Sequence, residues 1–131
     1  MIKFTIPGRL EGLNELILAN RRNRFLGAKI KHEQTDICAA AASGCRRPRG
    51  YPLMIHIHWV EKNSRRDPDN VASAKKYILD GLQAAGIIEN DGPKQIRGFI
   101  DTFSVDKDRP RIEVTIFEPE DVTDTPYFGR T

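Results

Sequence analysis

The chain has 131 residues, of which 39% are hydrophobic and 30% charged, and its formal net charge is +3. This length suits one domain with one core, and the absence of any run long enough for a transmembrane helix excludes a membrane-spanning protein. An alternating segment begins directly after Met1, so we expect no secretory signal. The two cysteines flank no metal-ligand pattern, and we expect a reduced, cytoplasmic protein.

Hydrophobic periodicity predicts both strands and helices, because apolar residues recur every second position in strands and about every 3.6 positions in helices. We expect strands at residues 2–6, 53–60, 96–105 and 111–117, and helices at residues 12–19, 29–42 and 71–85. The last two strands could pair as a hairpin across residues 106–110. The sequence therefore predicts one α+β domain over residues 1–117, with a mixed β-sheet of about four strands and helices packed on one side.

Charge is distributed unevenly along the chain. Residues 118–131 contain four acids and one arginine, a net charge of −3, so the other residues carry +6. We expect this acidic segment to be a flexible C-terminal tail. Basic residues gather at positions 21–24, 46–49 and 65–66, where they form either solvated loops or contacts to phosphates. A basic body suits a polyanionic ligand, but charge alone does not establish DNA binding.

The most informative stretch is Arg65-Arg66-Asp67-Pro68-Asp69-Asn70, which follows the apolar run at residues 53–60 and opens a helical pattern. Asp67 and Asp69 project to the same side if the backbone is extended, and Pro68 favours that geometry. Two like charges held close require a cation or a proton, and carboxylate oxygens favour Mg²⁺ or Mn²⁺. Beside two arginines, such a site suits a phosphate substrate.

A third acid, Asp91, follows the helix predicted at residues 71–85, in the turn-forming cluster at residues 89–93. Asp91 approaches the Asp67/Asp69 pair if the helix returns the chain across one edge of the sheet and residues 87–88 double back. The alternative is an ordinary turn aspartate. Likewise, Asp69 or Asn70 could simply cap the following helix, and the arginines could belong to a solvated turn.

Together these residues resemble RusA-type Holliday junction resolvases. The resemblance rests on Arg66-Asp67-x-Asp69-Asn70, on Lys76 with Asp80-Gly81-Leu82, and on Ala85-Gly86-Ile87 with Asn90-Asp91. It is strong over the middle third of the chain and weak at the flanks. It implies a RusA-like fold and a homodimeric, divalent-metal-dependent endonuclease that cuts four-way DNA junctions.

The resemblance also implies roles for single residues. Asp67, Asp69 and Asp91 would be the essential carboxylates that bind Mg²⁺ or Mn²⁺, and Lys76 would assist catalysis. Arg66 would contact DNA, and Arg65 and Lys75 are further candidates for DNA contact. 

Two features depart from the family pattern. The stretch between Asn70 and Asp80 is about one helical turn longer than in the best-known member, so the matching lysine is either Lys75 or Lys76. Lys76 keeps the four-residue spacing to Asp80 and lies on the polar side of the helix, whereas Lys75 borders the apolar stripe. Lys76 could otherwise be only a surface partner of Asp80. Asn90 stands where an acidic residue often precedes the last aspartate, which leaves fewer carboxylate ligands.

Other functions stay open. A strand followed by D-x-D also begins some phosphatases, usually near the N-terminus of a longer chain with a cap domain. A non-catalytic DNA-binding protein, with the acids serving as caps, is a second alternative. His56 and His58 share one face of the strand predicted at residues 53–60, but no third ligand has convincing spacing for zinc.

Overall fold

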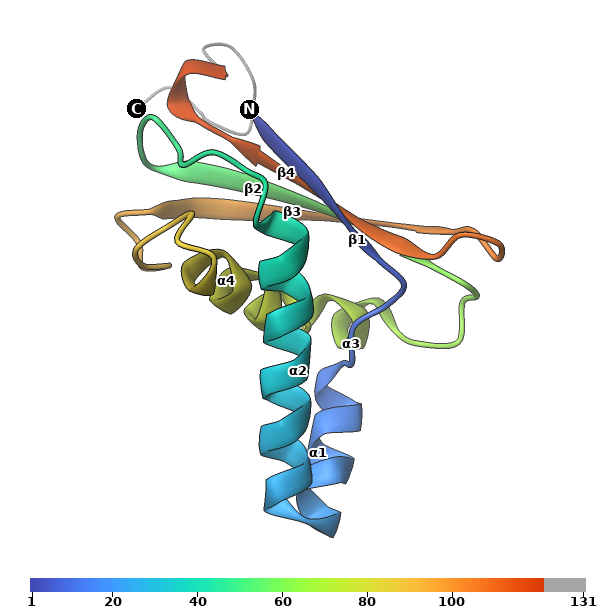
Figure 1. Cartoon of the computed structure of the whole chain (residues 1–131). Coiled ribbons are helices and arrows are strands. Elements are labelled where there is room, and N and C mark those ends of the chain that lie inside the picture. Colours follow the sequence, from blue (N-terminus) through green and yellow to red (C-terminus); the bar gives the residue numbers. More distant parts are fainter. Residues whose placement is uncertain (122–131) are drawn as a thin grey trace.

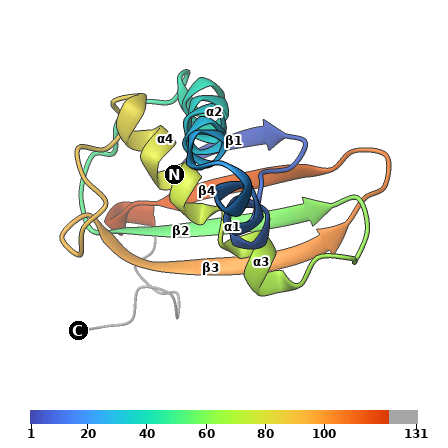
Figure 2. The same cartoon turned by 90° about the horizontal axis from the view of Figure 1, so that it is seen from below.

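The computed structural model describes residues 1–121. A four-stranded sheet forms one layer, and the helices cover one of its faces (Figures 1 and 2). The strands are β1 (Ile2–Pro7), β2 (Leu53–Glu61), β3 (Ile96–Val105) and β4 (Arg111–Phe117), in the spatial order β1-β4-β2-β3. β4 pairs antiparallel with β1 and β2, whereas β2 and β3 are parallel. The predicted α+β class, mixed sheet and one-sided helices are therefore confirmed.

The hairpin considered between β3 and β4 is wrong, because β2 lies between these two strands. The turn at residues 106–110 carries the chain past the end of β2, where the backbone N–H of Asp106 donates to the carbonyl oxygen of Glu61 at 2.9 Å. β2 is buried along most of its length, as expected for a strand with neighbours on both sides. Periodicity identified the strands but carried no information about which of them pair.

The helices are α1 (Leu13–Arg22), α2 (Arg24–Ala42), α3 (Pro68–Ala72) and α4 (Lys75–Ala84). The single helix predicted at residues 71–85 is thus divided in two. Ser73 explains the break, because its hydroxyl donates to the carbonyl oxygen of Asn70 at 2.5 Å and competes with the helical hydrogen bonds. α4 ends at Ala84, and Gly86 follows its C-cap residue with a φ of +74°, which suits a residue without a side chain.

The core lies between the sheet and the helices. Ile55, Ile57 and Trp59 of β2 are buried against Ile78 and Leu82 of α4. α4 also packs closely on α2: a Cβ at Gly81 would lie 2.5 Å from Cβ of Cys38 and 2.8 Å from the backbone nitrogen of Ala39. Gly81, part of the motif that carries the family resemblance, is therefore required for helix packing in this fold.

α1 and α2 form a helical hairpin that projects away from the sheet (Figure 1). Asn23 separates the two helices, and its side-chain oxygen accepts a hydrogen bond from the backbone N–H of Phe25 at 2.8 Å. The hairpin exposes several large apolar side chains, namely Leu13, Ile17, Leu18, Phe25, Leu26 and Ile37. Arginines at positions 21, 22 and 24 lie at its tip.

The predicted tail begins with residues that pack against the domain. Glu118 is 0% exposed, and its Oε1 pairs with Nη1 of Arg46 at 2.6 Å. Asp121 ends a short 3₁₀ helix, η1 (Pro119–Asp121), and pairs with the N-terminal amine of Met1 at 2.9 Å. These residues are therefore not part of a flexible tail, and residues 122–131 lie outside the described part of the chain. Within residues 1–121, no helix combines the length and apolarity needed to cross a membrane.

Candidate functional site

Residues 66–70 connect the loop after β2 to the first turn of α3, and Arg66 anchors the first end of this segment. This side chain is only 12% exposed. Its Nε donates to Oε1 of Glu61 at 2.8 Å, and its Nη1 donates to Oε1 of Glu15 at 3.1 Å and to the carbonyl oxygen of Leu10 at 3.0 Å. The guanidinium therefore neutralises two carboxylates inside the protein, and its geometry is that of a structural ion pair.

Asn70 anchors the other end of the segment. It is 8% exposed; its Nδ2 donates to Oε2 of Glu15 at 3.0 Å, and its Oδ1 accepts from the backbone N–H of Asn14 at 3.0 Å. The Oγ of Ser73 accepts from the backbone N–H of Leu13 at 2.8 Å. The side chains of Asn70 and Ser73 thus accept hydrogen bonds from free backbone N–H groups at the N-terminus of α1. They cap α1 from another part of the chain.

Glu15 joins the two anchors, because one of its oxygens faces Arg66 and the other faces Asn70. Burial acts to raise the pKa of Glu15, but hydrogen bonds from Asn70, the backbone and Arg66, together with the charge of Arg66, lower it below the ordinary value. Glu15 is therefore ionised at neutral pH and holds both anchors in place.

Asp67 and Asp69 lie between the anchors and are both exposed. Asp67 occupies the N-cap position of α3 in extended geometry, yet its side chain makes no capping hydrogen bond. The extended geometry considered for both aspartates is wrong for Asp69, because the helix already begins at Pro68. Oδ1 of Asp69 accepts the backbone N–H of Asn70 at 2.9 Å. Within residues 1–121, neither aspartate belongs to an ion pair. The alternative in which Asp69 or Asn70 caps the following helix does not describe this segment, because Asp67 holds that position and Asn70 caps α1.

The two adjacent lysines of α4 have different surroundings. Nζ of Lys75 lies 2.6 Å from Oδ2 of Asp101 and 4.5 Å from the ring centroid of Phe99. Nζ of Lys76 lies 3.0 Å from Oδ1 of Asp80 and 3.4 Å from Oδ2 of Asp91. Lys75 is held against the sheet, whereas Lys76 is exposed and joins two acids that are far apart in sequence.

The acids around Lys76 keep it charged. The hydrogen bond to Asp80 raises the pKa of Lys76, partial burial opposes this, and the charges of Asp80 and Asp91 raise it further. Lys76 is therefore a permanent cation at neutral pH. The predicted pair of Lys76 and Asp80 exists, and Asp91 is an additional partner that spacing alone did not indicate.

The three predicted metal ligands do not form one preassembled group. Within residues 1–121, no set of three or more histidine, cysteine, aspartate or glutamate side chains is placed to hold a metal ion. The buried residues Ile87 and Ile88 follow α4 into the core, and Asp91 contacts Lys76. Asp67 and Asp69 remain as two exposed carboxylates that lie two residues apart in the chain. One or two carboxylates completed by substrate phosphates are a common arrangement for Mg²⁺. The donor set therefore fits Mg²⁺ in that mode.

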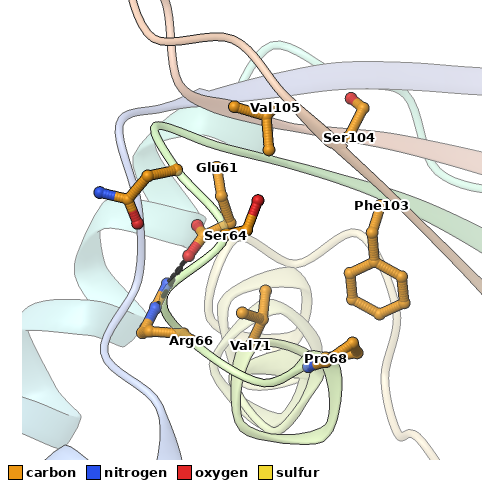
Figure 3. Close-up of a pocket in the computed structure, with 9 residues that line it drawn as sticks. Glu61, Ser64, Arg66, Pro68, Val71, Phe103, Ser104 and Val105 are labelled. Atoms are coloured by element: carbon orange, nitrogen blue, oxygen red, sulfur yellow. Dashed lines mark hydrogen bonds and ion pairs between the residues drawn. The ribbon is translucent and has the colours of Figure 1, made fainter.

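A cavity of about 220 Å³ adjoins the paired aspartates. Arg66 and Pro68, the two neighbours of Asp67, line it together with residues of β3, including Phe103 (Figure 3). Sequence reasoning did not select Phe103, Glu15 or Glu61 as parts of the site. Alternation along residues 96–105 groups Phe103 with Phe99 and Asp101 on one face, but only the parallel pairing with β2 turns that face toward the helices.

His56 and His58 lie on the face of the sheet that carries no helices, opposite buried Ile55, Ile57 and Trp59. Both imidazoles contact Oγ1 of Thr102, at 2.7 Å and 2.5 Å. Nε2 of His58 also contacts Oγ of Ser104 at 2.9 Å. Among the described residues they belong to no group of three or more metal-ligating side chains, and their ring nitrogens contact the hydroxyl groups of β3.

No protein-family model matches the chain, and no curated protein matches it.

Proposed function

We propose that this chain is a Mg²⁺- or Mn²⁺-dependent endonuclease that cuts branched DNA, including four-way junctions. The observation that carries the proposal is the anchored segment between Arg66 and Asn70. Its two ends are fixed by buried hydrogen bonds, while the two aspartates between them are exposed and have no cation partner among residues 1–121. A segment that exposes two like charges, two residues apart in the chain, favours binding of a divalent cation there.

In this proposal Asp67 and Asp69 hold the ion, which when bound polarises a phosphodiester and lowers the pKa of water. The protein residues around it have separate tasks. Arg66 and Asn70 fix the segment, and Lys76 supplies a positive charge for the phosphate or the leaving oxygen. Arg65 is exposed and available for a backbone phosphate. Arg66 and Lys75 are engaged with acids of their own chain, so the structure favours positioning roles for them over direct DNA contact.

The proposal includes a homodimer, because cutting two strands of a nearly symmetric junction requires two active sites. The apolar side chains exposed on the α1–α2 hairpin support this assembly, since exposed apolar surface favours association. It also includes a cytoplasmic location, which the free thiols of Cys38 and Cys45 support.

The direct test is incubation of the purified protein with labelled four-way junctions and matched linear duplexes, with and without Mg²⁺ or Mn²⁺. We expect paired incision of junctions only when the metal is present. Intact junctions at every metal concentration, with a folded protein that binds them, would contradict the proposal.

Substitution of Asp69 by Asn tests the site itself. We expect Asp69→Asn to lower the cleavage rate by at least about a hundredfold, because a metal ligand is lost. Junction binding should stay equal or become tighter, because the variant has one negative charge fewer. Asp108→Asn removes an exposed aspartate from the turn at residues 106–110 and is the matched control; it should cleave like the unmodified protein. Unchanged cleavage by Asp69→Asn would remove the site assignment.

A non-catalytic DNA-binding protein is the second candidate, favoured by the absence of a three-ligand group in residues 1–121. It predicts junction binding without cleavage and without dependence on Asp69. Calorimetric titration with Mn²⁺ separates the two, since only the endonuclease requires a carboxylate-dependent metal site.

A further inference from the structure

The cavity beside the paired aspartates has apolar walls and a polar rim. It lies between the loop after β2, the helix α3 and the end of β3, and its volume is about 220 Å³. The side chains of Pro68, Val71, Phe103 and Val105 point into the same space (Figure 3). The rim is formed by Asn63 and Ser64, whose amide and hydroxyl groups can donate or accept hydrogen bonds. Ser104 also borders the cavity, but its hydroxyl contacts His58 on the other face of the sheet.

Phe103 is the largest apolar side chain of this cavity and is 42% exposed. Val105, its neighbour on the same face of β3, is exposed as well. An aromatic ring that lines a cavity in this way offers a flat surface on which another planar group can stack. The cavity therefore combines a stacking face with polar groups at its edge.

Exposed cations belong to the two loops that border the cavity. Lys62 and Arg65 flank the rim residues Asn63 and Ser64, while Lys107 and Arg109 belong to the turn that follows Val105. The two loops meet where the backbone N–H of Asp106 donates to the carbonyl oxygen of Glu61. Within residues 1–121, none of these four cations is in an ion pair. Their charge complements a ligand that carries phosphates.

We propose that this cavity receives one unstacked nucleobase of a DNA strand, with Phe103 as its stacking partner. A base matches the cavity in chemistry, since it has an apolar face, a polar edge and an attached phosphate chain. The residues on both sides of Asp67 line the cavity, so a base held there brings its strand beside the paired aspartates. This inference rests on the proposed action on branched DNA and adds how the strand is gripped. An apolar protein side chain would fill the walls but would leave the four cations without partners.

The test compares binding to a duplex that contains one bulged base with binding to the same duplex without it, in EDTA so that cleavage plays no part. We expect the protein to bind the bulged duplex about tenfold more tightly or better, as base–aromatic stacking implies. Phe103→Ala should lose this preference, and Phe103→Trp should keep it. Phe99→Ala is the matched control, because Phe99 lies on the same strand face with 38% exposure but does not line the cavity.

A bulge that carries 2-aminopurine gives an independent measurement. Its fluorescence should change on binding to the protein and to Phe99→Ala, and should not change on binding to Phe103→Ala. Phe103→Leu keeps an apolar side chain without an aromatic face and serves if the alanine variant does not fold; we expect it to lose the preference too.

Retention of the bulge preference by Phe103→Ala and Phe103→Leu would overturn the inference. So would a change in oligomeric mass in these variants with unchanged DNA binding, because the cavity would then hold a second copy of the chain. A third outcome separates the two proposals. If the unmodified protein cleaves no junction with any metal but still prefers bulged duplexes through Phe103, the proposed endonuclease is refuted and the base-binding cavity is retained.

Discussion

Asp67 and Asp69 differ from the neighbouring acids in how their charge is balanced. Glu15 and Glu61 share the guanidinium of Arg66, which lies about 3 Å from both. The two aspartates have no such partner within residues 1–121. The charge of Arg66 therefore faces inward, toward Glu15 and Glu61, whereas the charges of Asp67 and Asp69 face solvent. This separation at single residues is what makes the aspartates candidates for an external cation.

The two lysines of α4 can be distinguished by experiment. Lys76→Ala should reduce the cleavage rate by about a hundredfold and junction affinity much less, because its charge would act on the reacting phosphate. Lys75→Ala should affect the rate less. It should instead lower the free energy of unfolding by about 1–2 kcal/mol, because it breaks the pair with Asp101 and the cation–π contact with Phe99.

Single-turnover cleavage and urea unfolding of both lysine variants make this comparison. Trp59, the only tryptophan of the chain, is buried and donates to Asp101 at 2.9 Å, so its fluorescence reports unfolding near Lys75. A larger rate loss in folded Lys75→Ala than in Lys76→Ala would show that Lys75 is the catalytic residue.

At the scale of elements, the capping of α1 by residues of α3 is the contact on which the site depends. Asn70→Ala removes the acceptor for Asn14 and a donor to Glu15. We expect it to lower the free energy of unfolding by about 1–3 kcal/mol, the range for a lost cap and an unpaired buried group. Urea unfolding measures this change.

Asn90→Ala is the control for that substitution, because Asn90 makes an exposed local hydrogen bond to the N–H of Asp91. Its effect should stay within about 0.5 kcal/mol. Equal stability of Asn70→Ala and Asn90→Ala would show that the cap from α3 does not stabilise the domain.

The elements show what periodicity can and cannot predict. All four strands were predicted within a residue or so, because half-buried strands alternate strictly. The division of the helix at Ser73 was missed, since it depends on a hydrogen bond to Asn70 and on a partner, Leu13, from a distant part of the chain. The pairing of β3 with β2 was missed for the same reason: strand partners are chosen by tertiary packing.

The candidate site was predictable in part. The spacing of Asp67 and Asp69 identified two exposed acids, and four-residue spacing identified the pair of Lys76 and Asp80. The inward turn of Arg66 could not be predicted, because its partner Glu15 lies on α1, far away in sequence. The contact between Lys76 and Asp91 depends in the same way on how the chain leaves α4.

For the whole molecule, the charge distribution makes a prediction about salt. The logarithm of junction affinity should fall linearly and steeply with the logarithm of salt concentration, because binding releases counterions. Arg65→Ala should reduce this slope by about one contact, since Arg65 is exposed. Filter binding over a salt series, with light scattering to measure the mass of the protein, tests both points.

Arg66→Ala is the informative comparison for Arg65→Ala. It should lower the free energy of unfolding by about 2 kcal/mol or more, because it leaves Glu15 and Glu61 without their common partner. A stable Arg66→Ala protein with a reduced salt slope would instead assign Arg66 to DNA contact.

A strict monomer that cuts both strands in one binding event would contradict the two-site mechanism.

The whole molecule should also lose stability in acid, and Glu118 is one cause. Burial acts to raise the pKa of Glu118, but the hydrogen bond from Arg46 and the charges of Arg46 and the N-terminus lower it. A lowered folded pKa means that the stabilisation is complete above the unfolded pKa of about 4.3 and is lost as the pH falls through the folded value. In urea unfolding measured between pH 7 and pH 3, the midpoint concentration should therefore decrease once the pH is below about 4.3.

Glu118→Gln should show a weaker fall in the midpoint over this range, because it cannot be protonated. Glu33→Gln, on the exposed surface of α2, should follow the unmodified protein. The same pH dependence in both variants would mean that other acids, such as Glu15, dominate acid unfolding.

The cap that α3 supplies to α1 gives the projecting hairpin a mechanical meaning. The hairpin is a lever attached at two places, by the cap from Asn70 on α1 and by the close packing of α2 on Gly81 of α4, and its far end carries the arginines on either side of Asn23. A force applied to that tip is therefore shared between α4 and the short helix α3, which begins at Pro68. Tilting of the arm would act on the cap at Asn70, the residue that directly follows Asp69.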